Sequence, residues 1–83
     1  MATNYRNTVN NFCQYLHFPR PVYHEGNPQG PEHDPLWTST VYIKDMKYGS
    51  GTGGSKDSAR ERAARAALVQ LHTEKPGYLQ LFP

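Results

Sequence analysis

A glycine-rich run leads directly into an alanine-rich segment, and this junction constrains the fold more than any other part of the sequence. The run reads Gly51-Thr52-Gly53-Gly54-Ser55-Lys56-Asp57-Ser58-Ala59-Arg60. Alanine favours helix strongly and serine is a preferred N-cap, so a helix is expected to begin at Ser55 or Ser58. The first N–H groups of a helix lack intrahelical partners and the helix dipole is positive there. The junction therefore predicts a phosphate site, strengthened by Lys56 and Arg60.

The N-terminal segment has the apolar spacing of a helix of about three and a half turns. The apolar positions are Tyr5, Val9, Phe12, Cys13 and Leu16. Thr3 or Asn4 is placed to cap this helix. Prolines at 19 and 21 forbid its continuation, so we expect it to end near His17.

Three strands are expected between the helices. Residues 22–25 are short and half apolar, and residues 26–35 form a polar loop. Residues 36–43 alternate as a strand, with Trp37, Val41 and Ile43 facing the core. Lys44-Asp45 predicts a tight hairpin into a third strand that starts at 46 and ends as it enters the glycines.

This order predicts an α+β, α-β-β-β-α fold, with two helices packed on one face of a three-stranded antiparallel sheet. A chain of 83 residues has no room for a second core, so we assign one domain to residues 1–75. Residues 76–83 form an apolar tail that either folds back over the core or contacts a partner. The second helix is expected to stop at Lys75-Pro76-Gly77, and its Glu61 and Arg65 have the spacing of an ion pair.

Composition favours binding over catalysis. The net charge of +2 is mild, so polyanion binding would depend on local placement of charge. A lone Cys13, no signal segment and no membrane-spanning run fit an intracellular protein without membrane contacts. The four histidines are scattered, and the GxGxxG match at 49–54 lacks the parallel βαβ unit of a dinucleotide site. We therefore expect no metal, no cofactor and no enzymatic activity.

Four separated motifs together resemble the double-stranded RNA-binding domain family. The family's Pro-x-Tyr, Gly-Pro-x-His and opening aromatic of the second strand are matched by Pro21-Val22-Tyr23, Gly30-Pro31-Glu32-His33 and Trp37. Its Gly-x-Gly-x-Ser-Lys-Lys-x-Ala-Lys block is matched by residues 51–60, and its following Ala-Ala and Ala-Leu are matched by Ala63-Ala64 and Ala67-Leu68. The resemblance covers residues 4–71 and implies a module that reads A-form duplexes by shape.

The resemblance also implies which residues contact RNA. Asn7 and Asn11 on the first helix would meet one minor groove, and the loop of Gly30, Pro31 and His33 would meet the other, where 2′-hydroxyls are accessible. Lys56 and Arg60 would straddle the phosphates of the major groove between them. About 16 base pairs would be spanned.

Asp57 departs from the family pattern because it stands where the second lysine is usual. A carboxylate between two cations repels phosphate, so weakened affinity and a smaller salt dependence are expected. The alternative is a protein-interaction or homodimerisation module with little or no RNA binding. Its surface would be the outer sheet face, with Thr38, Thr40 and Tyr42, the edge of the third strand, or the apolar tail.

Overall fold

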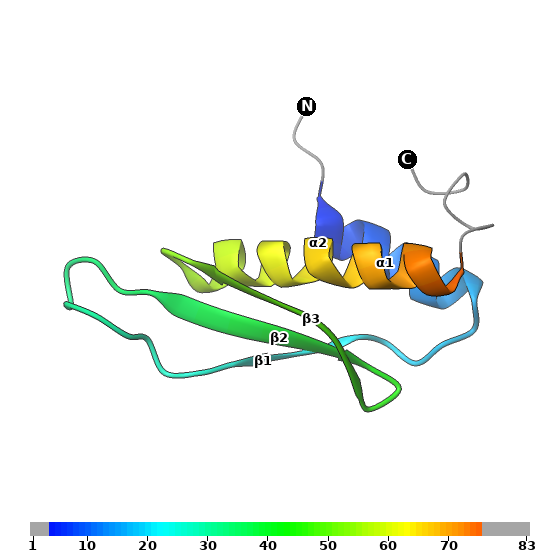
Figure 1. Ribbon diagram of the computed structural model, residues 1–83, viewed down its shortest axis with the longest axis horizontal. Coiled ribbons are helices and arrows are strands. Elements are labelled where there is room, and N and C mark those ends of the chain that lie inside the picture. The colour runs from blue at the N-terminus through cyan, green and yellow to red at the C-terminus, as the bar shows by residue number, and fades with distance from the viewer. Residues whose placement is uncertain (1–3, 76–83) are drawn as a thin grey trace.

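Two helices lie on one face of a three-stranded antiparallel sheet (Figure 1). A computed structural model describes residues 4–75. The elements are α1 (Tyr5–Tyr15), β1 (Val22–Glu25), β2 (Trp37–Ile43), β3 (Met46–Gly53) and α2 (Lys56–Glu74). The predicted fold class is confirmed, whereas the predicted role of the tail at 76–83 falls outside the described residues.

Helix α1 begins and ends where the sequence indicates. The Asn4 side chain caps it by accepting a 3.1 Å hydrogen bond from the N–H of Asn7. The chain leaves the helix after Tyr15 and turns at His17, whose φ of 60° is left-handed. The middle of the apolar stripe is buried, and Tyr5 and Leu16 at its two ends pack against the core.

The sheet has the order β1-β2-β3, so β1 and β3 are its edges. Lys44 and Asp45 connect β2 to β3 with φ values of 54° and 64°. Positive φ at both central residues is typical of the type I′ turn that joins twisted strands, so the predicted tight hairpin is confirmed. Val41 pairs with Gly49 while Tyr42 pairs with Lys47, which leaves Tyr48 as an extra, bulged residue.

The third strand does not end at the glycines, and in this respect the prediction is wrong. β3 continues to Gly53, and Gly49, Gly51 and Gly53 face α2 at alternate positions. A Cβ added at Gly51 would lie 2.5 Å from the backbone N of Ala63, and one at Gly49 would lie 2.6 Å from that of Ala67. These glycines therefore set the close approach of helix to sheet, and only residues 54 and 55 separate β3 from α2.

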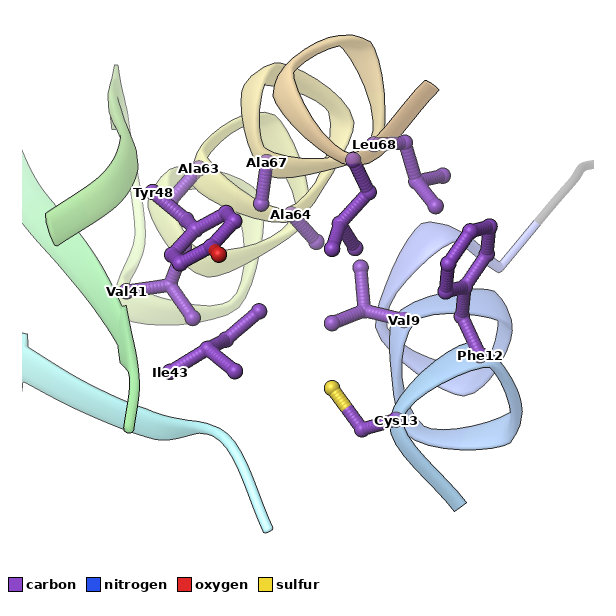
Figure 2. Close-up of a cluster of buried hydrophobic side chains, with 11 residues drawn as sticks. Val9, Phe12, Cys13, Val41, Ile43, Tyr48, Ala63, Ala64, Ala67 and Leu68 are labelled. Atoms are coloured by element: carbon purple, nitrogen blue, oxygen red, sulfur yellow. The ribbon is translucent and has the colours of Figure 1, made fainter. Parts of the chain in front are cut away.

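The hydrophobic core lies between the two helices and the inner face of the sheet (Figure 2). Its members come from every element except β1 and are Val9, Phe12, Cys13, Val41, Ile43, Tyr48, Ala63, Ala64, Ala67, Leu68 and Leu71. Small alanines line α2 where it crosses the glycines of β3, and leucines follow where α2 meets α1. The core thus fixes the start of α2 above the end of the sheet where β2 begins and β3 ends.

Candidate nucleic-acid interface

The start of α2 is closed by a reciprocal cap. Ser55 Oγ accepts from the N–H of Ser58 at 3.1 Å, and Ser58 Oγ accepts from the N–H of Ser55 at 3.3 Å. This capping box satisfies donors that would otherwise be open at the helix start. Two of the N–H groups at the helix start are therefore already bonded within the chain.

Lys56 is the exposed cation of the first turn. Its Nζ lies 5.0 Å from the centre of the Trp37 ring, within the range of a cation–π contact. Trp37 has the inward register that the alternation predicts, but it is only partly buried and lies outside the buried core cluster. Trp37 pairs with Gly53 at the end of the sheet, where α2 is just beginning, and the lysine partly covers it.

Arg60, one turn further along, is held by carboxylates. Its Nη2 donates to Glu25 Oε1 at 2.5 Å, and its Nη1 lies 3.7 Å from Asp57 Oδ1. Glu25 also accepts from the Ser39 hydroxyl at 3.4 Å. The hydrogen bond from Arg60 lowers the pKa of the Glu25 carboxyl, and the same bond raises the pKa of the Arg60 guanidinium. Arg60 is therefore already paired with Glu25 and Asp57. The spacing of Lys56 and Arg60 in the sequence did not reveal these ion pairs.

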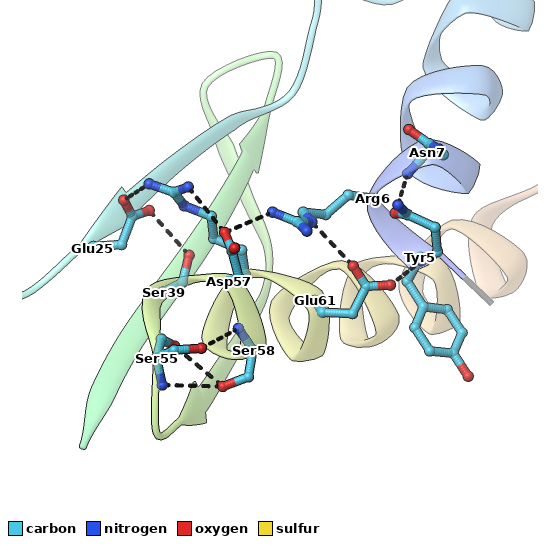
Figure 3. A network of polar contacts seen from close by, with 11 residues as sticks. Tyr5, Arg6, Asn7, Glu25, Ser39, Ser55, Asp57, Ser58 and Glu61 are labelled. Carbon is cyan, nitrogen blue, oxygen red and sulfur yellow. Dashed lines mark hydrogen bonds and ion pairs between the residues drawn. The ribbon is translucent and has the colours of Figure 1, made fainter. Parts of the chain in front are cut away.

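Arg6 of α1 reaches the same place and was missed by the sequence analysis (Figure 3). Its Nη1 lies 3.4 Å from Asp57 Oδ1 and its Nε donates to Glu61 Oε2 at 3.1 Å. The other Glu61 oxygen accepts from the backbone N–H of Tyr5. Glu61 thus bonds to α1 rather than pairing with Arg65, so that prediction is wrong. No local pattern could have found contacts between residues more than 50 positions apart.

These groups form what we call the α2 charge cluster. Its members are Arg6, Lys56, Arg60, Glu25, Asp57 and Glu61. Three cations are balanced by three carboxylates, so the cluster carries no net charge at neutral pH. Asp57 is the most exposed of the three carboxylates, with 77% of its side chain accessible.

The loop predicted to meet RNA extends from the same end of the sheet as the start of α2 (Figure 1). Gln29 and Leu36 close its base through two backbone hydrogen bonds of 2.9 and 2.7 Å. Gly30 adopts a φ of 88°, a conformation that favours glycine. Pro31 and His33 are exposed at the tip. A hydrogen-bonded base therefore presents an accessible tip.

The remaining predicted residues lie on α1. Asn7 and Asn11 are both exposed, one helical turn apart, on the side of α1 away from its buried stripe. The structure thus brings Lys56 and Arg60 together on α2, and it leaves the loop and the two asparagines as separate exposed regions. Three distinct patches, rather than one pocket, make up the candidate interface.

A comparison with protein families decides what kind of module this is. The family model described as the double-stranded RNA binding motif matches residues 5–71. The chain belongs to the double-stranded RNA-binding domain family.

Solved members of this family share the fold. The structure of Arabidopsis HYL1 has a TM-score of 0.73 and 30% identity, covering 83% of this chain and 97% of that one. A solution structure of both double-stranded RNA-binding domains of DRB4 has a TM-score of 0.67 and 28% identity, covering 83% of this chain and 44% of that one. The α-β-β-β-α order of the present domain is therefore that of its family.

Similar sequences also occur within ribonucleases. Ribonuclease 3 of Protochlamydia amoebophila is 32% identical over 68 residues, which are 82% of this chain and 28% of that enzyme. Ribonuclease 3 of Roseiflexus sp. is 48% identical over 51 residues, or 61% of this chain and 22% of the enzyme. The domain thus spans less than a third of the length of these relatives.

Residues 4–75 were also compared with the requirements of a metal site, a membrane-spanning helix and a reactive cysteine. Within residues 4–75, no three His, Cys, Asp or Glu side chains gather as a metal site. No helix in that range is long and apolar enough to cross a bilayer. Cys13 is buried, and burial raises the pKa of its thiol to about 11.

Proposed function

We propose that this domain binds double-stranded RNA and catalyses no reaction itself. The observation that carries the proposal is the set of three exposed patches on a fold of the double-stranded RNA-binding family. Asn7 and Asn11 would meet one minor groove, and the loop of Gly30, Pro31 and His33 would meet the next. An A-form duplex exposes its 2′-hydroxyls in that wide, shallow groove, so recognition would follow shape more than sequence.

Phosphate contacts would come from Lys56 and Arg60, which would straddle the major groove between the two minor grooves. Asp57 reduces this contribution because its carboxylate lies 3.7 Å from Arg60 and is exposed to the incoming phosphate. The α2 charge cluster as a whole is balanced. We therefore infer weaker and less salt-dependent binding than a domain with lysine at position 57 would show. An intracellular compartment, where Cys13 stays reduced, is the expected setting.

The test is binding to a labelled RNA duplex of about 20 base pairs, longer than the span of about 16 expected for this family. The same sequence as DNA duplex and as single-stranded RNA serves for comparison, at two salt concentrations. Preference for duplex RNA supports the proposal. Equal affinity for all three, or no binding at low salt, contradicts it.

Substitution then tests the residues. Charge reversal at Arg60 would place a carboxylate against Glu25 and Asp57, so we choose Lys56→Gln with Arg60→Gln. This pair should lower the salt slope by about two, at about 0.9 per phosphate contact. Lys47→Gln with Arg65→Gln removes the same charges from exposed positions elsewhere and should leave the slope nearly unchanged.

A protein-interaction or homodimerisation role is the second candidate, and the outer face of the sheet favours it. A hollow of about 530 Å³ lies on this face, away from the helices, between Val22, His24 and Tyr42. Val22, on the edge strand β1 of this face, is about half exposed. Light scattering at high protein concentration tests self-association, and a strict monomer there counts against homodimerisation.

A further inference from the structure

One carboxylate oxygen lies between two guanidinium groups at the edge of the α2 charge cluster. Oδ1 of Asp57 is 3.4 Å from Nη1 of Arg6 and 3.7 Å from Nη1 of Arg60 (Figure 3). The two arginines come from different helices, and the packing of α1 against α2 brings them to the same atom. Paired guanidiniums converging on one anionic oxygen are also the arrangement that binds phosphate.

Each arginine also bonds to a glutamate, Arg6 to Glu61 and Arg60 to Glu25. Glu61 accepts from Nε of Arg6 at 3.1 Å and Glu25 accepts from Nη2 of Arg60 at 2.5 Å. The side chains of these two glutamates are only 25% and 15% exposed. Arg6 is bound through Nε, which leaves its outer Nη1 turned to Asp57. The two guanidiniums are therefore held in place independently of Asp57.

Asp57 is the displaceable member of this arrangement. Its side chain is 77% exposed and its contacts to the two arginines are longer than those of the glutamates. Exposed ion pairs contribute little to stability because water screens them and the side chains lose freedom. A phosphate oxygen could thus replace the Asp57 carboxylate at small cost while both arginines keep their glutamate partners.

We propose that Arg6 and Arg60 form a two-arginine phosphate site, which the Asp57 side chain occupies in the free domain and an RNA phosphate takes over in the complex. This inference rests on the proposed RNA-binding function and adds Arg6 of α1 to its contacts. It also gives Asp57 a specific role. The aspartate competes with the backbone of the duplex for one site rather than simply lowering the local charge.

The experiment measures affinity for the 20-base-pair RNA duplex between 50 and 200 mM salt. Over this fourfold range each phosphate contact changes affinity by about 3.5-fold. Arg6→Gln should therefore lose one such contact. The ratio of its affinity at 50 mM salt to that at 200 mM should be about 3.5-fold smaller than the same ratio for the wild type. Arg65→Gln removes one charge from an exposed position of α2 and should not do so. Arg6→Lys should restore most of the salt dependence, since it keeps a cation at the site.

Asp57→Asn gives the second half of the test. Removing the competing carboxylate should raise affinity, and combining it with Arg6→Gln should abolish most of that gain. A gain that persists without Arg6, or an Arg6→Gln variant that behaves like Arg65→Gln, overturns the two-arginine site while RNA binding stands. Failure of both wild type and Asp57→Asn to bind the duplex at 50 mM salt overturns the proposed function instead. Circular dichroism melts confirm that each variant is folded at the temperature of the titration.

Discussion

Replacing Gly51 with alanine tests whether the glycines before α2 serve close packing of helix against sheet or phosphate binding through their backbone. The new methyl carbon would lie 2.5 Å from the backbone N of Ala63 and 2.6 Å from Cβ of Arg62, both on α2. Without this conflict, alanine would favour a strand over glycine by about 0.5–1 kcal/mol. Overfilling a packed interface costs about 1–3 kcal/mol, and backbone atoms on α2 can yield only if the whole helix moves. The cost therefore lies at the upper end of this range, about 3 kcal/mol, and subtracting the strand gain leaves a net loss of about 2 kcal/mol in the free energy of unfolding.

Thermal unfolding by circular dichroism measures this loss. For a domain of this size, about 2 kcal/mol corresponds to a decrease in Tm of roughly 8–16 °C. Gly26→Ala is the matched control, because a Cβ there meets nothing within 4 Å. Its free energy of unfolding should stay the same or rise by up to about 1 kcal/mol, since alanine restricts the unfolded chain.

RNA titration well below both melting temperatures completes the comparison. If Gly51 acts only in packing, the folded Gly51→Ala variant should keep its affinity for the duplex. A glycine that held phosphate through its backbone would give the reverse pattern, with unchanged Tm and weakened binding. A Tm for Gly51→Ala equal to or above that of the wild type would refute the packing argument.

Two further predictions concern protonation. The hydrogen bond from Arg60 lowers the pKa of Glu25 from its usual 4.5, so this pair stabilises the fold above about pH 4.5 and the contribution is lost as pH falls through the lowered value. The Tm difference between wild type and Glu25→Gln should accordingly shrink on acidification below pH 4.5, and a difference that stays constant down to pH 2.5 would contradict this. Burial raises the pKa of Cys13 from 9.0 to about 11. Because the thiolate is the reactive form, iodoacetamide at pH 8 should alkylate the folded domain at least about 100-fold more slowly than the domain in denaturant. Equal rates would show that the thiol is accessible.

Much of the fold could be predicted because its signals are local. The apolar spacing from Tyr5 to Leu16 defines one helix, the prolines at 19 and 21 end it, and Lys44-Asp45 occupies a two-residue turn. Each depends on backbone preferences within a few residues, so no knowledge of the partner element was needed. The family motifs then supplied the order of the elements.

The incorrect predictions concern residues whose environment is set by a helix or strand distant in the sequence. Gly51 was assigned to a loop because glycine weakens an isolated strand, yet it is a strand residue because α2 lies too close for any side chain. Glu61 was paired with Arg65 on its own helix, whereas Arg6 and the first N–H of α1 hold it instead. Trp37 has the inward register of a core residue, but it lies at the end of the sheet where no helix covers it fully.

The balanced charge of the α2 cluster also bears on how such a domain would select RNA. Long-range attraction to a polyanion needs an excess of positive charge, and the chain offers only +2 overall and none within the cluster. Contacts at hydrogen-bonding distance would then carry more of the affinity, and in an A-form groove these involve 2′-hydroxyls that DNA lacks. Removing Asp57 should strengthen phosphate contacts that RNA and DNA share. We therefore expect Asp57→Asn to bind both duplexes more tightly while its preference for RNA over DNA falls, and a preference that rises instead would show that position 57 acts on the hydroxyl contacts.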